Sequence, residues 1–214
     1  MTAIRVCETF ISLLGESTHA GLPAFFIRLS GCNLNCRYCD TVYARQEGEL
    51  QPIAKLAETA RRLPSLRVLV TGGEPLVQAE TGPLLAALLA SGCQVLLETN
   101  GSLPIAGVDT RVHRIVDVKC PASGMADHNH WPNLEALTPR DEVKFVAADE
   151  ADFTFALRVV KEYRLLERTP VLISPVFGVL PPRQAAAWIL ASGLPLRLNL
   201  QLHKYIWDPR ARGV

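Results

Sequence analysis

The stretch Cys32-Asn33-Leu34-Asn35-Cys36-Arg37-Tyr38-Cys39-Asp40-Thr41 decides the fold, and it follows the apolar run Ala24-Phe25-Phe26-Ile27-Arg28-Leu29 closely. Its three cysteines are separated by three residues and then by two, a spacing that brings all three sulfurs to one centre. Thiolates are soft ligands that suit zinc or an iron–sulfur cluster. A closed structural zinc site needs four protein ligands, whereas a reactive centre leaves one position open. The stretch therefore predicts a metal centre with one position free for a small molecule.

Length and composition exclude several classes of protein. A chain of 214 residues can bury one sizeable core, so we expect residues 1–214 to form a single domain. Lys and Arg number 22 against 21 Asp and Glu, and this balance argues against a nucleic-acid partner, including a tRNA that is modified directly. The first residues lack a signal-peptide pattern and the apolar stretches are short. We therefore expect a cytosolic protein with no membrane partner.

The remaining cysteines and one polar segment are weaker candidates for metal ligands. Six cysteines, three of them clustered, are too few for a disulfide framework in a chain of this length. Cys93 lies in an apolar run and is expected to act as a small core side chain. Cys120 is a disfavoured candidate for a fourth ligand. Asp127-His128-Asn129-His130 could bind a metal, but a solvated polar loop is the favoured interpretation.

Short apolar strands alternate with helical periodicity along the chain, which is typical of a parallel sheet in an α/β fold. The expected strands cover residues 5–14, 24–30, 66–71, 94–98, 112–118, 142–146, 169–173 and 195–202, and the expected helices cover residues 52–63, 76–91, 151–163 and 182–192. Residues 121–140 have little periodicity and are expected to form an irregular insertion. About six βα units are fewer than the eight of a closed barrel, so we expect an open, partial (β/α)6-type barrel.

Polar groups follow the expected strands, at the end of the sheet where parallel α/β folds place their ligands. They are the cysteine loop, Gly72-Gly73-Glu74-Pro75, Thr99-Asn100-Gly101, Asp117 with Lys119, and Ser174-Pro175. Arg28 is the odd charge within an apolar strand. It either reaches solvent from an edge strand or points into a cavity toward a carboxylate.

Two of these motifs together resemble the radical S-adenosylmethionine superfamily. They are Cys32-x-x-x-Cys36-x-x-Cys39, with Tyr38 before the third cysteine, and the turn Gly72-Gly73-Glu74-Pro75. The resemblance implies a [4Fe-4S] cluster whose open iron binds S-adenosylmethionine, with the glycine turn receiving the methionine amino group. It also implies an external electron donor of the flavodoxin or ferredoxin type.

The chain resembles one family more closely over nearly its whole length, the 7-carboxy-7-deazaguanine synthases. The blocks that carry this likeness are residues 15–16, 23–29, 31–34, 39–41, 141–146 and, most specifically, 200–207. The resemblance implies that 6-carboxy-5,6,7,8-tetrahydropterin undergoes a ring contraction and loses ammonia, in the 7-deazapurine pathway to queuosine. It further implies a homodimer and a Mg²⁺ ion bound by Thr41, whose hydroxyl is a reasonable oxygen ligand.

The same resemblance assigns roles residue by residue. It places the cofactor against Tyr38, Cys39, Asp40, Gly72, Gly73, Glu74, Asp117, Val118, Lys119, Ser174, Pro175, Val176 and Phe177. It places the substrate against Leu13, Leu14, Gly15, Glu16, Arg28, Thr71, His203 and the C-terminal Val214. Glu98, Asn100 and Ser123 are weaker candidates, and for His203 a hydrogen-bonded barrel histidine is the alternative.

The substrate loop departs from the family at two positions. The family usually reads Gln-Gly-Glu-Gly where this chain has Leu14-Gly15-Glu16-Ser17. Leucine removes a hydrogen-bonding side chain, and serine narrows the backbone freedom that glycine allows. The departure bears on pterin recognition more than on the chemistry.

Two other functions fit part of the sequence. A glycyl-radical-type activating enzyme shares the cysteine motif and the glycine turn, but gives no account of residues 200–207. A non-catalytic iron–sulfur or zinc-binding module, such as an electron carrier, would favour a fourth nearby cysteine and has no use for the motifs at the strand ends.

Overall fold

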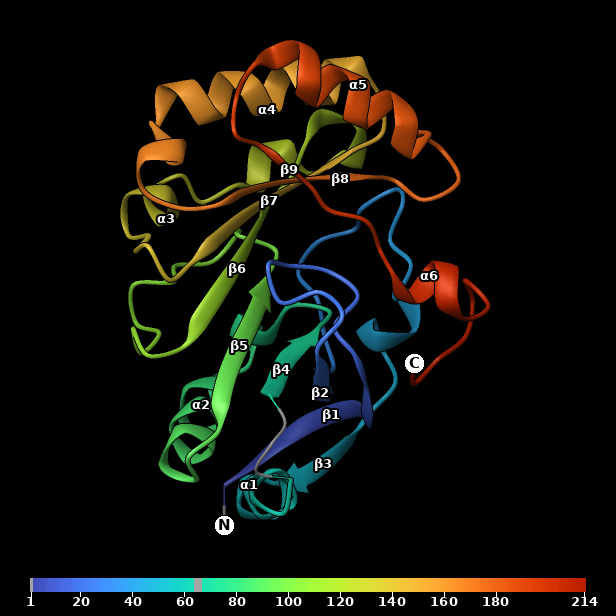
Figure 1. Cartoon of the computed structure of the whole chain (residues 1–214). Helices are drawn as coiled ribbons and strands as arrows, with labels where there is room; N and C mark the ends of the chain where they lie inside the picture. Colours follow the sequence, from blue (N-terminus) through green and yellow to red (C-terminus); the bar gives the residue numbers. More distant parts are fainter. Residues whose placement is uncertain (1, 64–66) are drawn as a thin grey trace.

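The computed structural model describes residues 2–63 and 67–214, and they form one curved sheet (Figure 1). The strands are β1 (Ala3–Leu13), β2 (Pro23–Leu29), β3 (Glu49–Pro52), β4 (Arg67–Gly72), β5 (Gln94–Thr99), β6 (His113–Val118), β7 (Glu142–Ala147), β8 (Val171–Pro175) and β9 (Arg197–Leu198). Their order is β3-β1-β2-β4-β5-β6-β7-β8-β9. Neighbours from β2 to β9 run parallel, and β1 and β3 add an antiparallel edge. Because the edge strands β3 and β9 do not pair with each other within the described chain, the sheet is not closed, and the expected open, partial barrel is confirmed.

The helices are α1 (Ile53–Arg61), α2 (Thr81–Ala90), α3 (Pro132–Glu135), α4 (Glu150–Glu162), α5 (Pro182–Ser192) and α6 (His203–Ile206). Four of them cover the outer face of the sheet in two groups, α1 with α2 and α4 with α5. Figure 1 shows α1 and α2 side by side near β1 to β5, and α4 and α5 beyond β7 to β9. Each group buries its apolar face against the nearest strands, which produces two core clusters. No helix in the described part of the chain is long and apolar enough to cross a membrane.

The inner face of the sheet changes from apolar to polar along each strand. An apolar floor is formed by Leu14, Ala24, Phe26, Leu69, Leu96 and Ile115. Two residues further along four of these strands stand Arg28, Thr71, Glu98 and Asp117, which therefore point to the same face. The sheet thus places a layer of charged and polar groups directly above a closed apolar floor, at the C-terminal ends of its strands.

The expected helix over residues 76–91 is wrong at its start, because α2 begins only at Thr81. The Glu74 side chain accepts a hydrogen bond from the Leu76 amide and caps one turn of 3-10 helix at Pro75–Val77. Gln78 is then extended, and its side chain binds the backbone of Arg5 and Ser30. These contacts fix the turn to the sheet before the helix can start.

The last expected strand is also shorter than predicted, since only Arg197–Leu198 pairs with β8. Beyond it the chain crosses toward the segment that follows β1, where the Leu202 amide donates a hydrogen bond of 2.9 Å to the Gly15 carbonyl. The short edge strand β3 was not predicted. Leu66, the expected first residue of the strand over 66–71, lies outside the described residues.

Two expectations about single segments have different outcomes. Arg28 is not on an edge strand, since β2 lies between β1 and β4, so the edge-strand explanation of this charge is wrong. The segment over 121–140 is irregular as expected. It consists of 3-10 turns at Pro121–Ser123 and Ala126–His128 followed by α3.

A buried ion pair fixes the end of this irregular segment to the sheet. Arg114 and Asp141 are only 2% and 1% exposed, and they form two parallel bonds, Nε to Oδ1 at 2.8 Å and Nη2 to Oδ2 at 2.6 Å. Asp141 also accepts the Thr138 amide at 2.7 Å. Burial alone would raise the pKa of Asp141, but Arg114 and Thr138 lower it overall.

We predict that Asp141→Asn lowers the free energy of unfolding by about 3–5 kcal/mol, because it leaves the Arg114 charge buried without its partner. Urea denaturation of the two proteins measures this difference. Asp109→Asn is the matched control, since Asp109 pairs with Arg111 at the surface, and it should change the midpoint far less. Equal midpoints for wild type and Asp141→Asn would contradict the prediction.

Candidate active site

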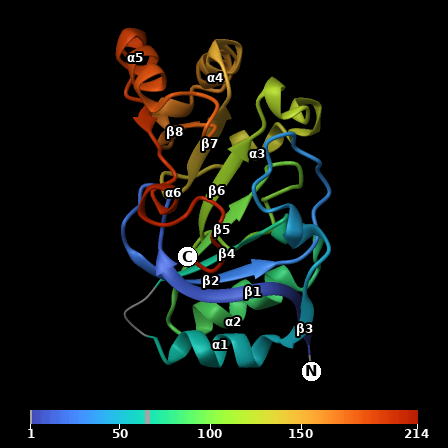
Figure 2. The same cartoon turned by 90° about the vertical axis from the view of Figure 1, so that its right-hand side faces the viewer.

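One cavity of about 840 Å³ opens at the C-terminal ends of the strands. Four parts of the chain line it: the cysteine loop, the ends of the central strands, the loop of residues 14–22 between β1 and β2 (the β1–β2 loop), and the C-terminal segment from α6 onward. Figure 2 shows α6 and the C-terminus beside the blue β1–β2 loop. Segments from both ends of the chain therefore meet over the same floor.

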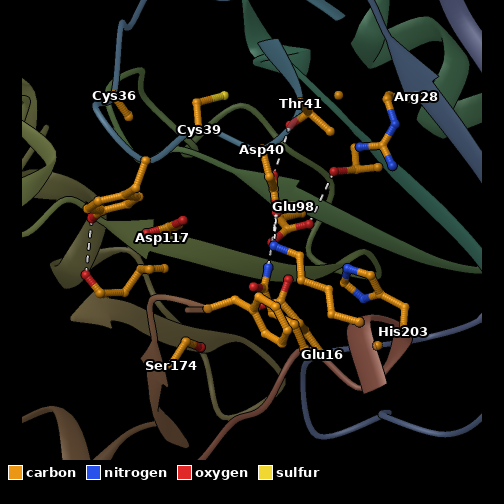
Figure 3. A pocket seen from close by; sticks show the side chains of 18 of the residues that line it. Glu16, Arg28, Cys36, Cys39, Asp40, Thr41, Glu98, Asp117, Ser174 and His203 are labelled. Atoms are coloured by element: carbon orange, nitrogen blue, oxygen red, sulfur yellow. Dashed lines mark hydrogen bonds and ion pairs between the residues drawn. The ribbon is translucent and has the colours of Figure 1, made fainter. Parts of the chain in front are cut away.

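The three clustered cysteines line this cavity. Cys32, Cys36 and Cys39 are partly exposed and form no disulfide. Burial raises the pKa of the Cys36 thiol, while Lys119 opposes that rise. The side-chain amide of Asn100 lies 3.8 Å from the Cys32 sulfur. Figure 3 shows Cys36 and Cys39 on one side of the cavity, and Arg28 and His203 on the other.

The glycine turn packs directly against the cysteine loop. A Cβ atom at Gly73 would overlap the Gly31 carbonyl and stand 2.8 Å from Cys32 Cβ. Gly72 has φ of 146°, and a Cβ there would stand 2.7 Å from the Leu29 amide nitrogen. Only glycine fits at both positions, so the sequence brings the turn's backbone next to the cysteines.

Glu74 does not line the cavity but lies beneath it, fully buried. Its carboxylate accepts the Asn100 amide at 2.6 Å, the Thr99 hydroxyl at 2.8 Å and the Leu76 amide at 2.9 Å. Burial raises the pKa of Glu74. The side chain thereby joins the turn after β4 to the end of β5.

A network of buried charges forms the wall above the apolar floor. The Lys144 ammonium contacts Glu98 and lies 3.5 Å from Glu16 Oε1 and 3.8 Å from Asp117 Oδ2. Lys119 pairs with Asp117 at 2.9 Å. Asp117 Oδ1 is buried and has no hydrogen-bond partner in the described part of the chain. The cavity wall therefore holds an acceptor that a ligand can use.

These contacts shift the protonation of the network. Burial raises the pKa of Glu16 to about 7, although Lys144 opposes that rise. Burial also acts to raise the pKa of Glu98, but its bonds to Lys144 lower it overall. Burial disfavours a charged Lys144, yet Glu16 and Glu98 raise its pKa well above the usual value. Near neutral pH, Lys144 and Glu98 are thus ionised, whereas burial favours the protonated form of Glu16.

Arg28 presents a free edge to the cavity. Its Nε donates to Glu8 Oε1 at 2.7 Å, and the Tyr43 hydroxyl donates to the same oxygen at 2.8 Å. Among the described residues, neither Nη atom has a hydrogen-bond partner. The guanidinium is therefore held in place on one side and available on the other.

The C-terminal segment also lines the cavity, and two ion pairs hold it in place. Lys204 pairs with Asp40 at 2.5 Å, and Arg212 pairs with Glu47 at 3.0 Å. Burial lowers the pKa of His203, and Lys204 adds to this effect. His203 packs so closely on Gly15 that a Cβ atom there would overlap its ring.

The structure brings most of the predicted site residues together. The cavity is lined by Leu13, Leu14, Gly15, Glu16, Arg28, Cys32, Cys36, Tyr38, Cys39, Asp40, Thr41, Thr71, Gly72, Gly73, Asp117, Lys119, Ser174, Pro175, Val176, Phe177, His203 and Val214. Glu98 and Asn100 also line it, whereas Glu74, Val118 and Ser123 do not. Val118 and Cys120 are buried in the core cluster beside α4. Cys120 is therefore separate from the cavity-lining sulfurs.

Sequence reasoning gave no role to several cavity residues. Lys144, Tyr43, Gln201, Lys204 and Arg212 all line the cavity. Lys144 carried a signal, since a lysine within the apolar strand over 142–146 needs a buried partner. The placement of the others in the cavity depends on how segments distant in sequence meet, as the pairs Lys204–Asp40 and Arg212–Glu47 show.

A second group of metal-ligand side chains lies apart from the cavity. His19, His113 and Glu142 have ligand atoms within 4.8 Å of one another, and none of the three lines the cavity. The described part of the chain shows no such grouping at Asp127-His128-Asn129-His130.

Comparison with known proteins first gives the class. Residues 26–170 match the family model described as the Radical SAM superfamily, whose enzymes use a [4Fe-4S] cluster and S-adenosylmethionine. Two solved structures share the fold: QueE from Escherichia coli, with TM-score 0.73 and 21% identity over 92% of this chain and 93% of that chain, and Streptococcus suis SuiB bound to S-adenosylmethionine, with TM-score 0.57 and 12% identity over 79% and 48%. At these identities they show the fold alone.

Curated relatives give the particular family. The chain is 46% identical over 214 residues to a 7-carboxy-7-deazaguanine synthase of Chlorobaculum tepidum, covering 99% of this chain and 97% of the relative. It is 41% identical to the synthase of Koribacter versatilis, covering 99% and 100%. The chain belongs to the 7-carboxy-7-deazaguanine synthase family.

We predict that Gly73→Ala reduces both the iron bound per chain and the affinity for S-adenosylmethionine, because the added methyl group meets the Gly31 carbonyl and Cys32. Iron and sulfide analysis after anaerobic reconstitution, with equilibrium binding, measures both. Gly82→Ala is the control, since nothing lies within 4 Å of a Cβ atom there. A Gly73→Ala protein with full iron content and unchanged affinity would refute the packing argument.

Proposed function

We propose that this chain converts 6-carboxy-5,6,7,8-tetrahydropterin to 7-carboxy-7-deazaguanine with release of ammonia, in the 7-deazapurine pathway to queuosine. The observation that carries this proposal is a single cavity that joins the three-cysteine loop to a free arginine edge and a buried charge network. Full-length relatives that bear the synthase name support the same reaction. Ring contraction with loss of ammonia is redox-neutral overall, so no second substrate is needed.

The residues present fit the two cofactors. Cys32, Cys36 and Cys39 offer three partly exposed thiols to one cavity, which leaves one iron of a cubane cluster without a protein ligand. When bound, the cluster and S-adenosylmethionine would supply a 5′-deoxyadenosyl radical able to abstract the hydrogen atom at C6 of the pterin. Gly73 offers backbone beside the cysteines, where a larger residue would fill the space.

The cofactor's organic part has a complementary wall. Asp117 Oδ1 is a buried acceptor that no described residue hydrogen-bonds, and Lys119 holds the other carboxylate oxygen at 2.9 Å. We therefore assign Asp117 to a donor group of S-adenosylmethionine. Tyr38 is fixed by its hydroxyl, which donates to the Val146 carbonyl at 3.1 Å. Further proposed contacts are Asp40, Gly72, Lys119, Ser174, Pro175, Val176 and Phe177.

The opposite wall suits the pterin. The Nη atoms of Arg28, to which no described residue is hydrogen-bonded, match a carboxylate, which a guanidinium binds through two parallel hydrogen bonds. Glu98, kept ionised by Lys144, accepts hydrogen bonds from ring N–H groups, while Glu16, with its pKa raised to about 7 by burial, can accept or donate. Leu13, Leu14, Gly15, Thr71, His203 and Val214 complete the proposed substrate contacts. Leu14 packs into the apolar floor, so it supports the ring by contact rather than by a hydrogen bond.

The remaining proposals concern partners and organisation. The electron that activates the cluster comes from an external flavodoxin-like or ferredoxin-like protein, and the enzyme is a homodimer, as the family resemblance implies. Its proposed location is the cytosol. Residues 1–214 act as one domain, which the continuous sheet supports. The balance of 22 basic and 21 acidic residues favours a free small molecule over nucleic acid as the substrate.

The rival functions fit less well. A non-catalytic iron–sulfur or zinc module needs no cavity of about 840 Å³ beside its metal. A glycyl-radical-type activating enzyme needs an open groove for a protein segment, whereas here the C-terminal segment is tied across the mouth by Lys204–Asp40 and Arg212–Glu47.

We predict that the reconstituted protein forms 7-carboxy-7-deazaguanine from carboxytetrahydropterin with S-adenosylmethionine, reductant and Mg²⁺ under anaerobic conditions. Mass spectrometry of the product measures this. Cys36→Ala should lose the cluster and the activity together. Cleavage of S-adenosylmethionine with an intact cluster but without this product would refute the substrate and keep the superfamily chemistry.

We also propose that Thr41 binds Mg²⁺ together with the substrate carboxylate. Thr41 lines the cavity next to Asp40, with its hydroxyl 3.4 Å from Asp40 Oδ1. We predict that Thr41→Ala weakens the Mg²⁺ dependence of pterin binding and turnover while the iron content stays unchanged. Thr41→Ser keeps the hydroxyl and should restore the response. An undiminished Mg²⁺ response in Thr41→Ala would exclude this ligand.

A further inference from the structure

The β1–β2 loop closes on itself and then reaches across the barrel. Two backbone hydrogen bonds of 2.8 Å join the two ends of the loop. The Leu14 amide donates to the Leu22 carbonyl, and the Gly21 amide donates to the Leu14 carbonyl. Leu14 is 2% exposed and packs into the apolar floor. The loop starts at β1 and contacts strands on the other side of the sheet, so its position depends on what it meets there.

Glu142, at the start of β7, is the main partner of this loop. Its side chain is fully buried. The Thr18 amide donates to both carboxylate oxygens, at 3.0 and 3.1 Å, and the Thr18 hydroxyl bonds to one of them. His113 Nε2 lies 2.7 Å from the same oxygen. These donors use both oxygens, so we read Glu142 as a hydrogen-bond anchor rather than as a metal ligand with His19 and His113.

A second side chain holds the neighbouring residue. Asn199 is 5% exposed, and its Oδ1 accepts the Ser17 amide at 3.0 Å while its Nδ2 donates to Ser174 at 2.7 Å. Ser17 has φ of 75°, a left-handed conformation that disfavours serine and needs support from its surroundings. The anchors therefore hold the loop in a shape that its own sequence does not favour.

The register of β7 links this anchor to the cavity. Glu142 and Lys144 are two residues apart, so their side chains point to the same face of the strand. Both contact the β1–β2 loop on that face: Glu142 accepts a hydrogen bond from Thr18, and Lys144 lies 3.5 Å from Glu16. We infer that Glu142 is a positioning residue for substrate binding, acting through Thr18 to keep Glu16 beside Lys144 in the cavity. This inference rests on the proposed role of residues 13–16 as the substrate loop.

The hydrogen-bond partners of Glu142 determine which parts of the structure are affected when its side chain is removed. They belong to the β1–β2 loop and to His113, whereas β7 itself is held by backbone pairing with β6 and β8. Removing the side chain therefore frees the loop and leaves the sheet and the cysteine loop in place. The cost falls on the substrate, which has to order the loop when it binds.

We predict that Glu142→Ala raises KM for carboxytetrahydropterin about ten- to hundredfold, the effect of losing a hydrogen bond to a charged group. kcat at saturation, iron content and S-adenosylmethionine cleavage without pterin stay near wild-type values. Glu142→Gln keeps one acceptor and gives an intermediate KM. Thr18→Val removes only the Thr18 hydroxyl and should also raise KM. Because Thr18 is exposed, this variant tests the inference even if Glu142→Ala does not fold. Thr18→Ser is its control.

Hydrogen exchange separates this inference from the proposed function. In Glu142→Ala the amides of Ser17, Thr18 and Gly21 should exchange faster, while those of β7 keep their protection. That result stands even if wild type forms no 7-carboxy-7-deazaguanine, in which case only the assigned substrate fails. Unchanged exchange in the loop, an unchanged KM, or a loss of iron content parallel to activity would each overturn the positioning role.

Discussion

The buried ammonium of Lys144 is the interaction on which the arrangement of the cavity depends. It stands on the inner face of β7 and contacts carboxylates from three other segments: Glu98 at the end of β5, Asp117 on β6 and Glu16 in the β1–β2 loop. A lone ammonium at this depth would be strongly disfavoured, so the three acids and the base require one another. The apolar floor below keeps water from replacing these contacts. Substrate and cofactor are therefore received by a wall whose charged side chains are held in place before either binds.

Much of the fold follows from local patterns. The parallel strands, the helices over them and the open barrel were predicted because apolar strands and amphipathic helices alternate with short connections. The start of α2 was not, because the Glu74 carboxylate holds an intervening 3-10 turn through the Leu76 amide. Strand β3 and the shortened β9 were missed for a related reason. Their extent is decided by pairing and by loop contacts distant in sequence, not by their own residues.

The candidate site was predictable where it follows strand ends, and this includes most of its residues. The sequence could not show in which direction each of these side chains points. Glu74 follows a strand as Gly73 does, yet its side chain points away from the cavity. It is held there by hydrogen bonds from the Leu76 amide, the Thr99 hydroxyl and the Asn100 amide. Arg28 was expected in the cavity, but its partner Glu8 was not, since that pair joins β1 to β2 across the antiparallel edge. Local sequence patterns also do not show which distant loops contact one another, as at the ion pair of Lys204 and Asp40.

The long span of the contacts at the β1–β2 loop has a consequence for synthesis of the chain. The hairpin of β1 and β2 can form as soon as its residues emerge, but Ser17 meets Asn199 across 182 positions and Gly15 meets Leu202. The substrate loop therefore has its full set of contacts only when nearly the whole polypeptide has been made. The cysteine loop also depends on later segments, since Tyr38 donates to the Val146 carbonyl and Asp40 pairs with Lys204. Both the radical-generating part and the substrate-selecting part of the cavity are therefore completed late in synthesis.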